Sequence, residues 1–267
     1  MIQNMLVKLN DIKRAEEFSH LVMNMHRFTD SIIINFLDEG FYFQGMEQSQ
    51  VCLFEVNLTK GYFDQYEKTK GDAPTIGLKT TILQKIFNSR DSDQTVEMKY
   101  NGDPDKIQIS FESVKNSKSI PKFFEIPLID VEQTNLSIPD KEYTAEVNVE
   151  TKTFSSIVSN LLVFGEDIKV KCQEDEIWMS SSNYEGEMKV FLMDKTENDY
   201  IIEYISEQDC DILLQFKSKY ISNFCAFSKL AKNVWLYFIE DEPMQMKYEM
   251  GEESYVRFYL APYNDNE

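Results

Sequence analysis

The chain has 267 residues, 42% of them hydrophobic and 13% aromatic, with only 9 glycines and 7 prolines. A chain of this length and composition buries roughly three quarters of its surface on folding, which excludes general disorder and predicts one large or two ordinary domains. Its 46 acidic residues outnumber 27 basic ones, for a net charge of −19. Contact with nucleic acid or an anionic membrane would therefore need a locally basic surface.

Hydrophobic periodicity in the first half of the chain predicts an alternation of helices and strands. Apolar residues at helical spacing predict a helix over residues 11–27 and a second one over residues 79–87. Strands, marked by alternating apolar residues, are expected near residues 31–36, 41–43, 52–56, 96–100 and 107–111.

The second half of the chain repeats the first. Phe18–Phe28, moved by 136 positions, falls on Phe154–Phe164 with five identical residues. A second block, Lys79–Phe87, falls on Lys217–Cys225 at an offset of 138. Two blocks in the same order at nearly one offset indicate duplication of a domain. Helices are accordingly expected near residues 153–163 and 217–227.

The stretch between the two copies has no clear period and contains Pro121, Pro127 and Pro139. It is longer than an ordinary connection, and long connections are often functional. We therefore predict a first domain over residues 1–117, a connecting loop over residues 118–140 and a second domain over residues 141–267.

The sequence offers little catalytic chemistry. His20 and His26 are the two histidines, six residues apart, and neither belongs to a zinc-binding or nucleophile motif. No glycine-rich phosphate-binding motif occurs, and the acidic clusters are typical of a solvated surface. We predict no enzymatic activity, no metal and no cofactor; a metal-dependent nuclease is the enzyme alternative.

Targeting signals are also missing from the pattern. No stretch approaches 18 apolar residues, and the first residues lack a basic region followed by a long apolar one. The 4 cysteines include no Cys-x-x-Cys pair, which is typical of a reducing compartment. An intracellular protein without a membrane span is expected.

Cations gather on the predicted helices. Lys13, Glu17, His20 and Arg27 recur at helical spacing and share one face, with Arg14 beside them. Lysines on exposed helix faces are common, so this pattern alone indicates only that charge could be segregated on one side of an acidic protein.

Several stretches together resemble the sliding clamps of the proliferating cell nuclear antigen (PCNA) type. Val256–Pro262 resembles the family's closing strand, and Ile129–Gln133 followed by Leu136–Tyr143 resembles its interdomain connecting loop. Phe43–Leu53 resembles a first-domain signature, and Lys13-Arg14 on the first helix completes the set. The resemblance is collinear over nearly the whole chain.

The resemblance implies two duplicated α+β clamp domains per chain, with helices on the inner face and curved antiparallel sheets outside. Three chains would close into a ring around duplex DNA without regard to sequence and tether a DNA polymerase. A clamp loader, a homotrimer and action in replication and repair are implied partners and roles. The compartment would be the nucleus, a viral factory or an archaeal cytoplasm. Alternatives are a checkpoint-type or heterotrimeric clamp subunit, or a monomeric viral-type processivity factor.

The resemblance also implies three sets of site residues. The DNA-facing set is Lys13, Arg14, His20, Lys79, Lys85, Lys217 and Lys219. The pocket for partner peptides with a Q-x-x-[apolar]-x-x-aromatic-aromatic motif is Met46, Gln50, Leu53, Leu136, Ile138, Pro243, Tyr259, Ala261 and Pro262. The subunit interface is Phe123, Phe124, Gly186, Met188, Lys189 and Val190. The third helix departs from the family, because it has Ser156, Ser159 and Val163 where basic residues are usual.

Overall fold

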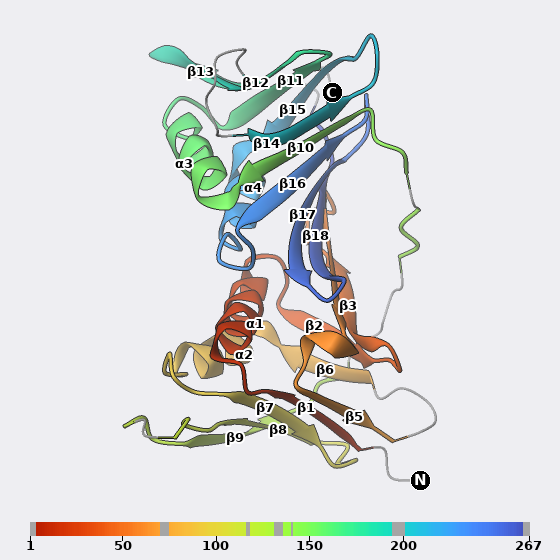
Figure 1. The fold of residues 1–267 in the computed structure, drawn as a ribbon, viewed down its shortest axis with the longest axis vertical. Helices are drawn as coiled ribbons and strands as arrows, with labels where there is room; N and C mark the ends of the chain where they lie inside the picture. Colours follow the sequence, from red (N-terminus) through yellow and green to blue (C-terminus); the bar gives the residue numbers. More distant parts are fainter. Residues whose placement is uncertain are drawn as a thin grey trace. The chain divides into compact units, whose positions relative to one another are not determined.

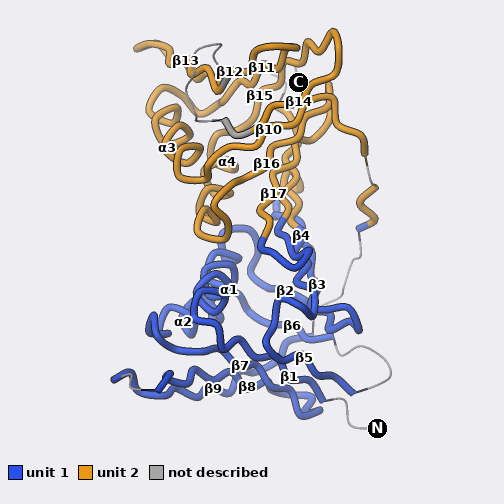
Figure 2. The backbone as a smooth tube through the Cα atoms, viewed as in Figure 1, with its two compact units in different colours: residues 1–48, 55–136, 250–256 blue, residues 49–54, 137–249, 257–267 orange. Residues whose placement is uncertain are grey.

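A computed structural model describes residues 4–69, 75–115, 118–130, 136–139, 141–193 and 201–263. The chain divides into two compact units, shown in different colours in Figure 2. Unit 1 holds residues 1–48, 55–136 and 250–256, and unit 2 holds residues 49–54, 137–249 and 257–267. Each unit is described by itself.

Unit 1 combines two antiparallel sheets with two helices (Figure 1). Its sheets have the strand orders β5-β1-β7-β8-β9 and β4-β3-β2-β6. The elements are β1 (Met5–Leu9), α1 (Ile12–Asn24), β2 (Ser31–Phe36), β3 (Gly40–Met46), β4 (Cys52–Thr59), β5 (Gln65–Lys68), β6 (Thr75–Lys79), α2 (Thr80–Asn88), β7 (Val96–Tyr100), β8 (Lys106–Phe111) and β9 (Lys122–Pro127), with short 3₁₀ turns at Met25–Arg27 and Lys60–Tyr62.

Unit 2 has the same plan. Its sheets have the orders β14-β10-β16-β17-β18 and β13-β12-β11-β15. The elements are β10 (Ala145–Glu150), α3 (Thr151–Leu161), β11 (Asp167–Gln173), β12 (Glu176–Asn183), β13 (Gly186–Met193), β14 (Ile201–Ser206), β15 (Asp211–Lys217), α4 (Ser218–Cys225), β16 (Asn233–Phe238), β17 (Met244–Gly251) and β18 (Ser254–Leu260).

The two plans match strand for strand, so the predicted duplication and the α+β class are confirmed. Adding nine to each strand number of unit 1 gives the matching strand of unit 2. The order β5-β1-β7-β8-β9 thus becomes β14-β10-β16-β17-β18, and β4-β3-β2-β6 becomes β13-β12-β11-β15. In both units the two helices pack against each other (Figure 1). No helix among the described residues is long and apolar enough to cross a membrane.

Aromatic side chains dominate the core of each unit. In unit 1, the ring of Phe18 on α1 meets Phe41 at 5.9 Å and Phe87 at 5.7 Å, both edge to face. In unit 2, Phe224 on α4 stacks on Phe258 at 4.7 Å. Such pairs add to the stabilisation that burial of large apolar surfaces provides. The helices are therefore held to the sheets by their apolar faces, which leaves their other faces available to solvent.

The first helix begins where its sequence can satisfy its free N–H groups. Asp11 is the N-cap, and its carboxylate accepts a hydrogen bond from the backbone N–H of Arg14 at 2.8 Å. The helix ends at Asn24 and continues as a 3₁₀ turn to Arg27. The prediction of one helix over residues 11–27 therefore holds for the segment, with its last turn tightened.

Part of the predicted connecting loop is a strand. Within residues 118–140, Lys122–Pro127 forms β9, which pairs with β8 from Lys106↔Pro127 to Phe111↔Lys122. Ile126 is buried, and half-buried Phe124 meets the ring of Phe111 at 5.6 Å. Residues 131–135 and 140 of the predicted loop lie outside the described residues.

After β9 the chain is fixed to β6 at a glycine. The N–H of Ile129 donates to the carbonyl of Gly77 at 3.0 Å. A Cβ at position 77 would lie 2.2 Å from the carbonyl oxygen of Ile129, so any side chain would push this backbone away. The beginning of the connecting segment is thereby fixed to the sheet of unit 1.

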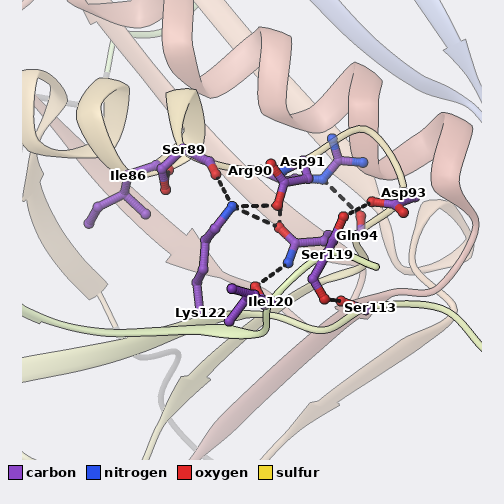
Figure 3. A network of polar contacts seen from close by, with 10 residues as sticks. All are labelled: Ile86, Ser89, Arg90, Asp91, Asp93, Gln94, Ser113, Ser119, Ile120 and Lys122. Atoms are coloured by element: carbon purple, nitrogen blue, oxygen red, sulfur yellow. Dashed lines mark hydrogen bonds and ion pairs between the residues drawn. The ribbon is translucent and has the colours of Figure 1, made fainter. Parts of the chain in front are cut away.

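A polar network fastens the start of β9 to the end of α2 (Figure 3). Lys122 donates to the carbonyl of Ser89 and, at 2.7 Å, to the carboxylate of Asp91. Gln94, which is fully buried, donates to the carbonyl of Ile120 at 2.8 Å and accepts from the N–H of Asp91 at 3.0 Å. This network holds the edge strand in place where its apolar contacts begin.

We expect Gln94→Leu to lower the free energy of unfolding by about 1–3 kcal/mol, because it leaves buried donors and acceptors without partners. Urea unfolding followed by circular dichroism would measure the loss. Gln108→Leu is the control, since Gln108 lies exposed on β8 of the same sheet. Equal losses in both variants would contradict a special contribution from the network.

Candidate functional site

Acidic residues are excluded from most of the helical surface. Helices α2, α3 and α4 together contain 28 residues and no Asp or Glu. The four helices carry five cationic residues against the two acids Glu16 and Glu17 on α1, a net charge of +3, in a chain whose net charge is −19. The predicted segregation of charge is therefore present on the helices.

Three of the predicted DNA-facing cations of unit 1 are exposed. The side chain of Lys13 is 86% exposed and pairs with Glu17 at 3.4 Å. Lys79 is the N-cap residue of α2, and Lys85 lies in its last turn. Partial burial is the main cause that raises the pKa of Glu17, which the charge of Lys13 opposes. Lys85 and Lys79 are exposed on α2 and at its N-cap, and α2 has no acid, whereas Lys13 shares its charge with Glu17.

Arg14 and His20 are more firmly engaged than predicted. The guanidinium of Arg14 donates to the carbonyls of Gly61 and Tyr62, each at 3.1 Å, and lies 3.5 Å from Glu252. The imidazole of His20 is 19% exposed and lies 3.7 Å from the carboxylate of Glu16. Arg14 is thus a residue that ties α1 to its own unit, and only a small part of its charge faces solvent.

The second histidine, His26, contacts the backbone of its own helical segment and a side chain of α2. His26 Nδ1 lies 2.6 Å from the carbonyl of Met23, and Nε2 lies 3.2 Å from the amide nitrogen of Gln84 on α2. It therefore links the end of the first helical segment to α2. Among the described residues, no group of three or more His, Cys, Asp or Glu side chains is close enough to hold a metal ion.

Unit 2 contains two of the predicted DNA-facing cations, and one of them is paired with a carboxylate. Lys219 is exposed in the first turn of α4. Lys217 lies 2.8 Å from the carboxylate of Asp167, and its ammonium lies 3.6 Å from the ring centroid of Tyr263. The hydrogen bond to Asp167 is the main cause that raises the pKa of Lys217. Lys217 therefore fixes the end of β15 to the C-terminal segment.

Helix α3 presents hydroxyl and amide groups in place of charge. Ser156, Ser159 and Asn160 are exposed along it, Val163 beyond its end is 72% exposed, and Lys152 is its one cation. Sequence reasoning missed Lys152, although its place one residue into a helix without acids is the signal that marks it. Hydroxyl and amide groups also contact phosphates, so this face is polar without being strongly positive.

Each unit presents one strand of the predicted subunit interface at the edge of a sheet. In unit 1 it is β9, whose one partner strand is β8. Phe123 points outward and is 73% exposed, whereas Phe124 packs inward on Phe111. The two candidate aromatics therefore differ in exposure, with Phe123 open to solvent and Phe124 half-buried against Phe111.

In unit 2 the edge is β13, whose partner strand is β12. Its side chains alternate, with Lys189 and Phe191 exposed and Gly186, Met188 and Val190 partly buried. The ammonium of Lys189 lies 3.8 Å from the ring centroid of Trp178 and 4.7 Å from that of Phe191. The exposed face of this edge is therefore an aromatic surface with one cation on it. Neither Trp178 nor Phe191 was among the interface residues that the family resemblance implies.

None of the nine residues of the predicted peptide pocket is fully buried. In unit 1, Met46 ends β3 and is exposed, and the carbonyl of Leu136 accepts from the side-chain amide of Gln44 at 3.2 Å. Leu53 is half-buried although both its neighbours on β4 are buried. The remaining members in unit 2 are Gln50, Ile138, Pro243, Tyr259, Ala261 and Pro262, all half-buried or exposed.

The C-terminal part of this set is fixed within unit 2. The N–H of Ala261 donates to the carbonyl of Val51 at 3.0 Å, and the N–H of Tyr263 donates to the carbonyl of Gln215 at 2.6 Å. Gln50, in the turn before Val51, has a positive φ of 59°. The backbone next to Ala261 and Pro262 is therefore held by hydrogen bonds, while the side chains of both residues stay half-buried.

Comparison with known proteins gives a consistent result. Residues 10–135 match the family model for the N-terminal domain of proliferating cell nuclear antigen, and residues 137–263 match the model for its C-terminal domain. The chain is 28% identical to proliferating cell nuclear antigen of Chaetomium thermophilum over 226 residues, which is 84% of this chain and 86% of that protein.

Two further relatives extend the match. Proliferating cell nuclear antigen 2 of Drosophila melanogaster is 27% identical over 84% of this chain and 85% of its own length. DNA polymerase sliding clamp 1 of Thermococcus kodakarensis is 26% identical over 93% of this chain and 95% of its own length. With both domains matched in order on two units of identical strand order, the chain belongs to the proliferating cell nuclear antigen family of sliding clamps.

Proposed function

We propose that this chain is a DNA sliding clamp, a processivity factor that encircles duplex DNA and tethers a DNA polymerase to it. The observation that carries the proposal is the charge of the helices, which is +3 in a chain of −19. The net negative charge of the molecule repels a polyanion, whereas the helices, with their excess of cations, attract it. A DNA-associated location inside the cell follows from this function.

The mechanism we infer is topological. Lys13, Lys85 and Lys219 contact phosphates, and the serines of α3 add neutral hydrogen bonds, all without reading bases. Because these contacts are few and weak, the duplex can move through the ring, and retention depends on ring closure. No bond is made or broken in this action, so the clamp needs no catalytic residue and no cofactor.

Ring closure should use the two exposed edges. Unpaired strand edges invite pairing with another chain, and Phe123 on β9 and Phe191 on β13 supply apolar contacts beside them. When β9 of one chain meets β13 of the next, the contact is head to tail and closes into a ring if the rotation allows. We infer three copies, opened on DNA by a clamp loader.

Partner proteins should bind through a short peptide. The predicted pocket of nine residues offers accessible apolar side chains near the fixed backbone of Ala261 and Val51. A peptide with two adjacent aromatics after an apolar residue can bury those rings there, as small interfaces concentrate their energy in a few anchors.

Retention on DNA tests the topological mechanism. We expect the clamp, once loaded, to stay on nicked circular DNA at moderate salt and to be lost from the same DNA after linearisation, because a closed ring leaves only over an end. Gel filtration of labelled clamp–DNA complexes would measure retention. Lys13→Glu combined with Lys219→Glu should reduce retention on circles, whereas Lys169→Glu should not, because Lys169 is exposed on strand β11 and not on a helix. Equal retention on circular and linear DNA would contradict the proposal.

The mass in solution tests the ring. We expect a species of three times 31.4 kDa at micromolar concentration, measured by light scattering. Phe123→Glu places a charge in the apolar seam and should shift the species toward monomer without unfolding, since Phe123 is already exposed. Leu213→Glu is the matched control, because Leu213 is exposed on β15 at the opposite edge of its sheet from β13. A monomeric wild type would favour the monomeric processivity factor.

Peptide binding tests the pocket. A peptide of the stated motif should bind with micromolar affinity, about −8 kcal/mol. Leu136→Ala should weaken it by about 1–2 kcal/mol, because truncating one anchor contact has this effect, while the trimer stays intact. Calorimetry would measure both, with Leu213→Ala as the control. Unchanged binding to Leu136→Ala would place the peptide site elsewhere.

A further inference from the structure

The solvent face of one sheet in unit 2 carries aromatic side chains that the clamp function does not use. Trp235 and Tyr237 on β16 stack with ring centroids 5.9 Å apart and planes 20° apart. Tyr143 lies 4.7 Å from Tyr237, before β10 begins. All three are only partly buried. We call Tyr143, Trp235 and Tyr237 the aromatic shelf.

A hollow of about 180 Å³ adjoins the shelf. Its lining includes the three tyrosines 143, 237 and 259 and the three cations Lys141, Lys247 and Arg257. Among the residues that the structure describes, none that lines the hollow is acidic, although acids outnumber bases by 46 to 27 in the whole chain. The described lining therefore combines aromatic rings with three cations, which favours an occupant that carries an anionic group.

The cations are held in place by carboxylates at the rim. Lys247 pairs with Glu249 at 2.6 Å and Lys141 pairs with Glu242. Lys247 lies opposite Trp235 in the register of β16 and β17. An incoming carboxylate can share these ammonium groups, because an ammonium has three donors. On the β10 side, Glu146 lies opposite Tyr237, so the anionic group of the occupant must lie toward β17 and β18.

The hollow is continuous with the proposed peptide pocket. Tyr259 belongs to both, and Pro139, which also lines the hollow, follows pocket residue Ile138 directly in the chain. A peptide bound in the pocket would therefore carry its flanking residues past the hollow and onto the shelf. Tyrosine and tryptophan that are half-exposed in this way are the residue types that dominate interface energies.

We propose that the shelf and hollow form an extension of the peptide site that binds an acidic, aromatic-bearing flank of partner peptides. The flank's carboxylate would lie against Lys247 and Arg257, and its ring would lie on Trp235 and Tyr237. This inference rests on the proposed function, since it assigns the occupant as the flank of the same partner peptide. It would let this clamp distinguish partners that share the core motif.

Fluorescence anisotropy with matched peptides tests the extension. Each labelled peptide contains the core motif and a flanking segment with one tyrosine and either two glutamates or two glutamines. Two series are made, one with the flank before the core motif and one with the flank after it. In one of the two series, we expect wild type to bind the glutamate peptide roughly tenfold more tightly than the glutamine peptide. Lys247→Gln should reduce this gain to less than threefold and leave the glutamine peptide unaffected. Lys169→Gln removes one charge from an exposed lysine on β11, and this variant should still bind the glutamate peptide roughly tenfold more tightly than the glutamine peptide.

A second variant tests the aromatic part. Trp235→Thr keeps a residue that suits a strand and should weaken both flanked peptides severalfold, but not the bare core peptide. Equal affinity for glutamate and glutamine flanks at both ends would overturn the extension, as would a gain that survives Lys247→Gln. A single-stranded oligonucleotide that competes with the flank and loses binding in Lys247→Gln would assign the surface to nucleic acid instead.

The outcomes also separate this inference from the peptide pocket. If the bare core peptide fails to bind while the glutamate peptide binds and depends on Lys247, the pocket is wrong and the extension stands. If the core peptide binds and depends on Leu136 but neither flank adds affinity, the pocket stands and the extension is wrong. If no peptide binds, both are wrong.

Discussion

An acidic protein that holds a polyanion must keep its own acids away from the contact. In this chain α2, α3 and α4 contain no Asp or Glu. The absence of glutamate lowers the intrinsic helix propensity of α3, because glutamate is among the better helix formers and α3 has serine, threonine and asparagine instead. Such a helix depends on packing, and α3 supplies it by burying Phe154, Val158 and Leu161.

The duplicated plan also explains how one chain can join two neighbours. The edge strand of unit 1, β9, ends a five-membered strand order, whereas the edge strand of unit 2, β13, ends a four-membered one. Because the two edges come from different sheets, a contact between them would be head to tail, and the rotation at the contact would set how many chains close the ring. The polar network around Lys122 and Gln94 holds the β9 edge in place.

The sequence predicted the duplication and the helices correctly because both depend on hydrophobic periodicity and on position in a repeat, whereas the three sets of candidate residues follow from the family resemblance and stay predictions. It did not predict β9, because the stretch between the two copies has no clear hydrophobic period and contains three prolines, whereas the burial of Ile126 depends on β8 as a partner. It also assigned Arg14 and Lys217 to DNA from charge and position. Their partners are the carbonyls of Gly61 and Tyr62 and the carboxylate of Asp167, none of them adjacent in the sequence.

The two kinds of contact in this protein call for opposite physical solutions. A duplex that must slide requires contacts that are equal at every register, so a few lysines and many neutral hydroxyl groups suffice, and closure of the ring supplies retention. Selecting one partner protein over another requires contacts whose binding free energy differs between them. Apolar pockets and aromatic rings provide this difference, because binding weakens when the partner lacks a ring or a methylene group. The helices accordingly carry small polar residues, whereas the half-buried leucine, proline and tyrosine side chains lie in the connecting segment, in turns and near the last strand.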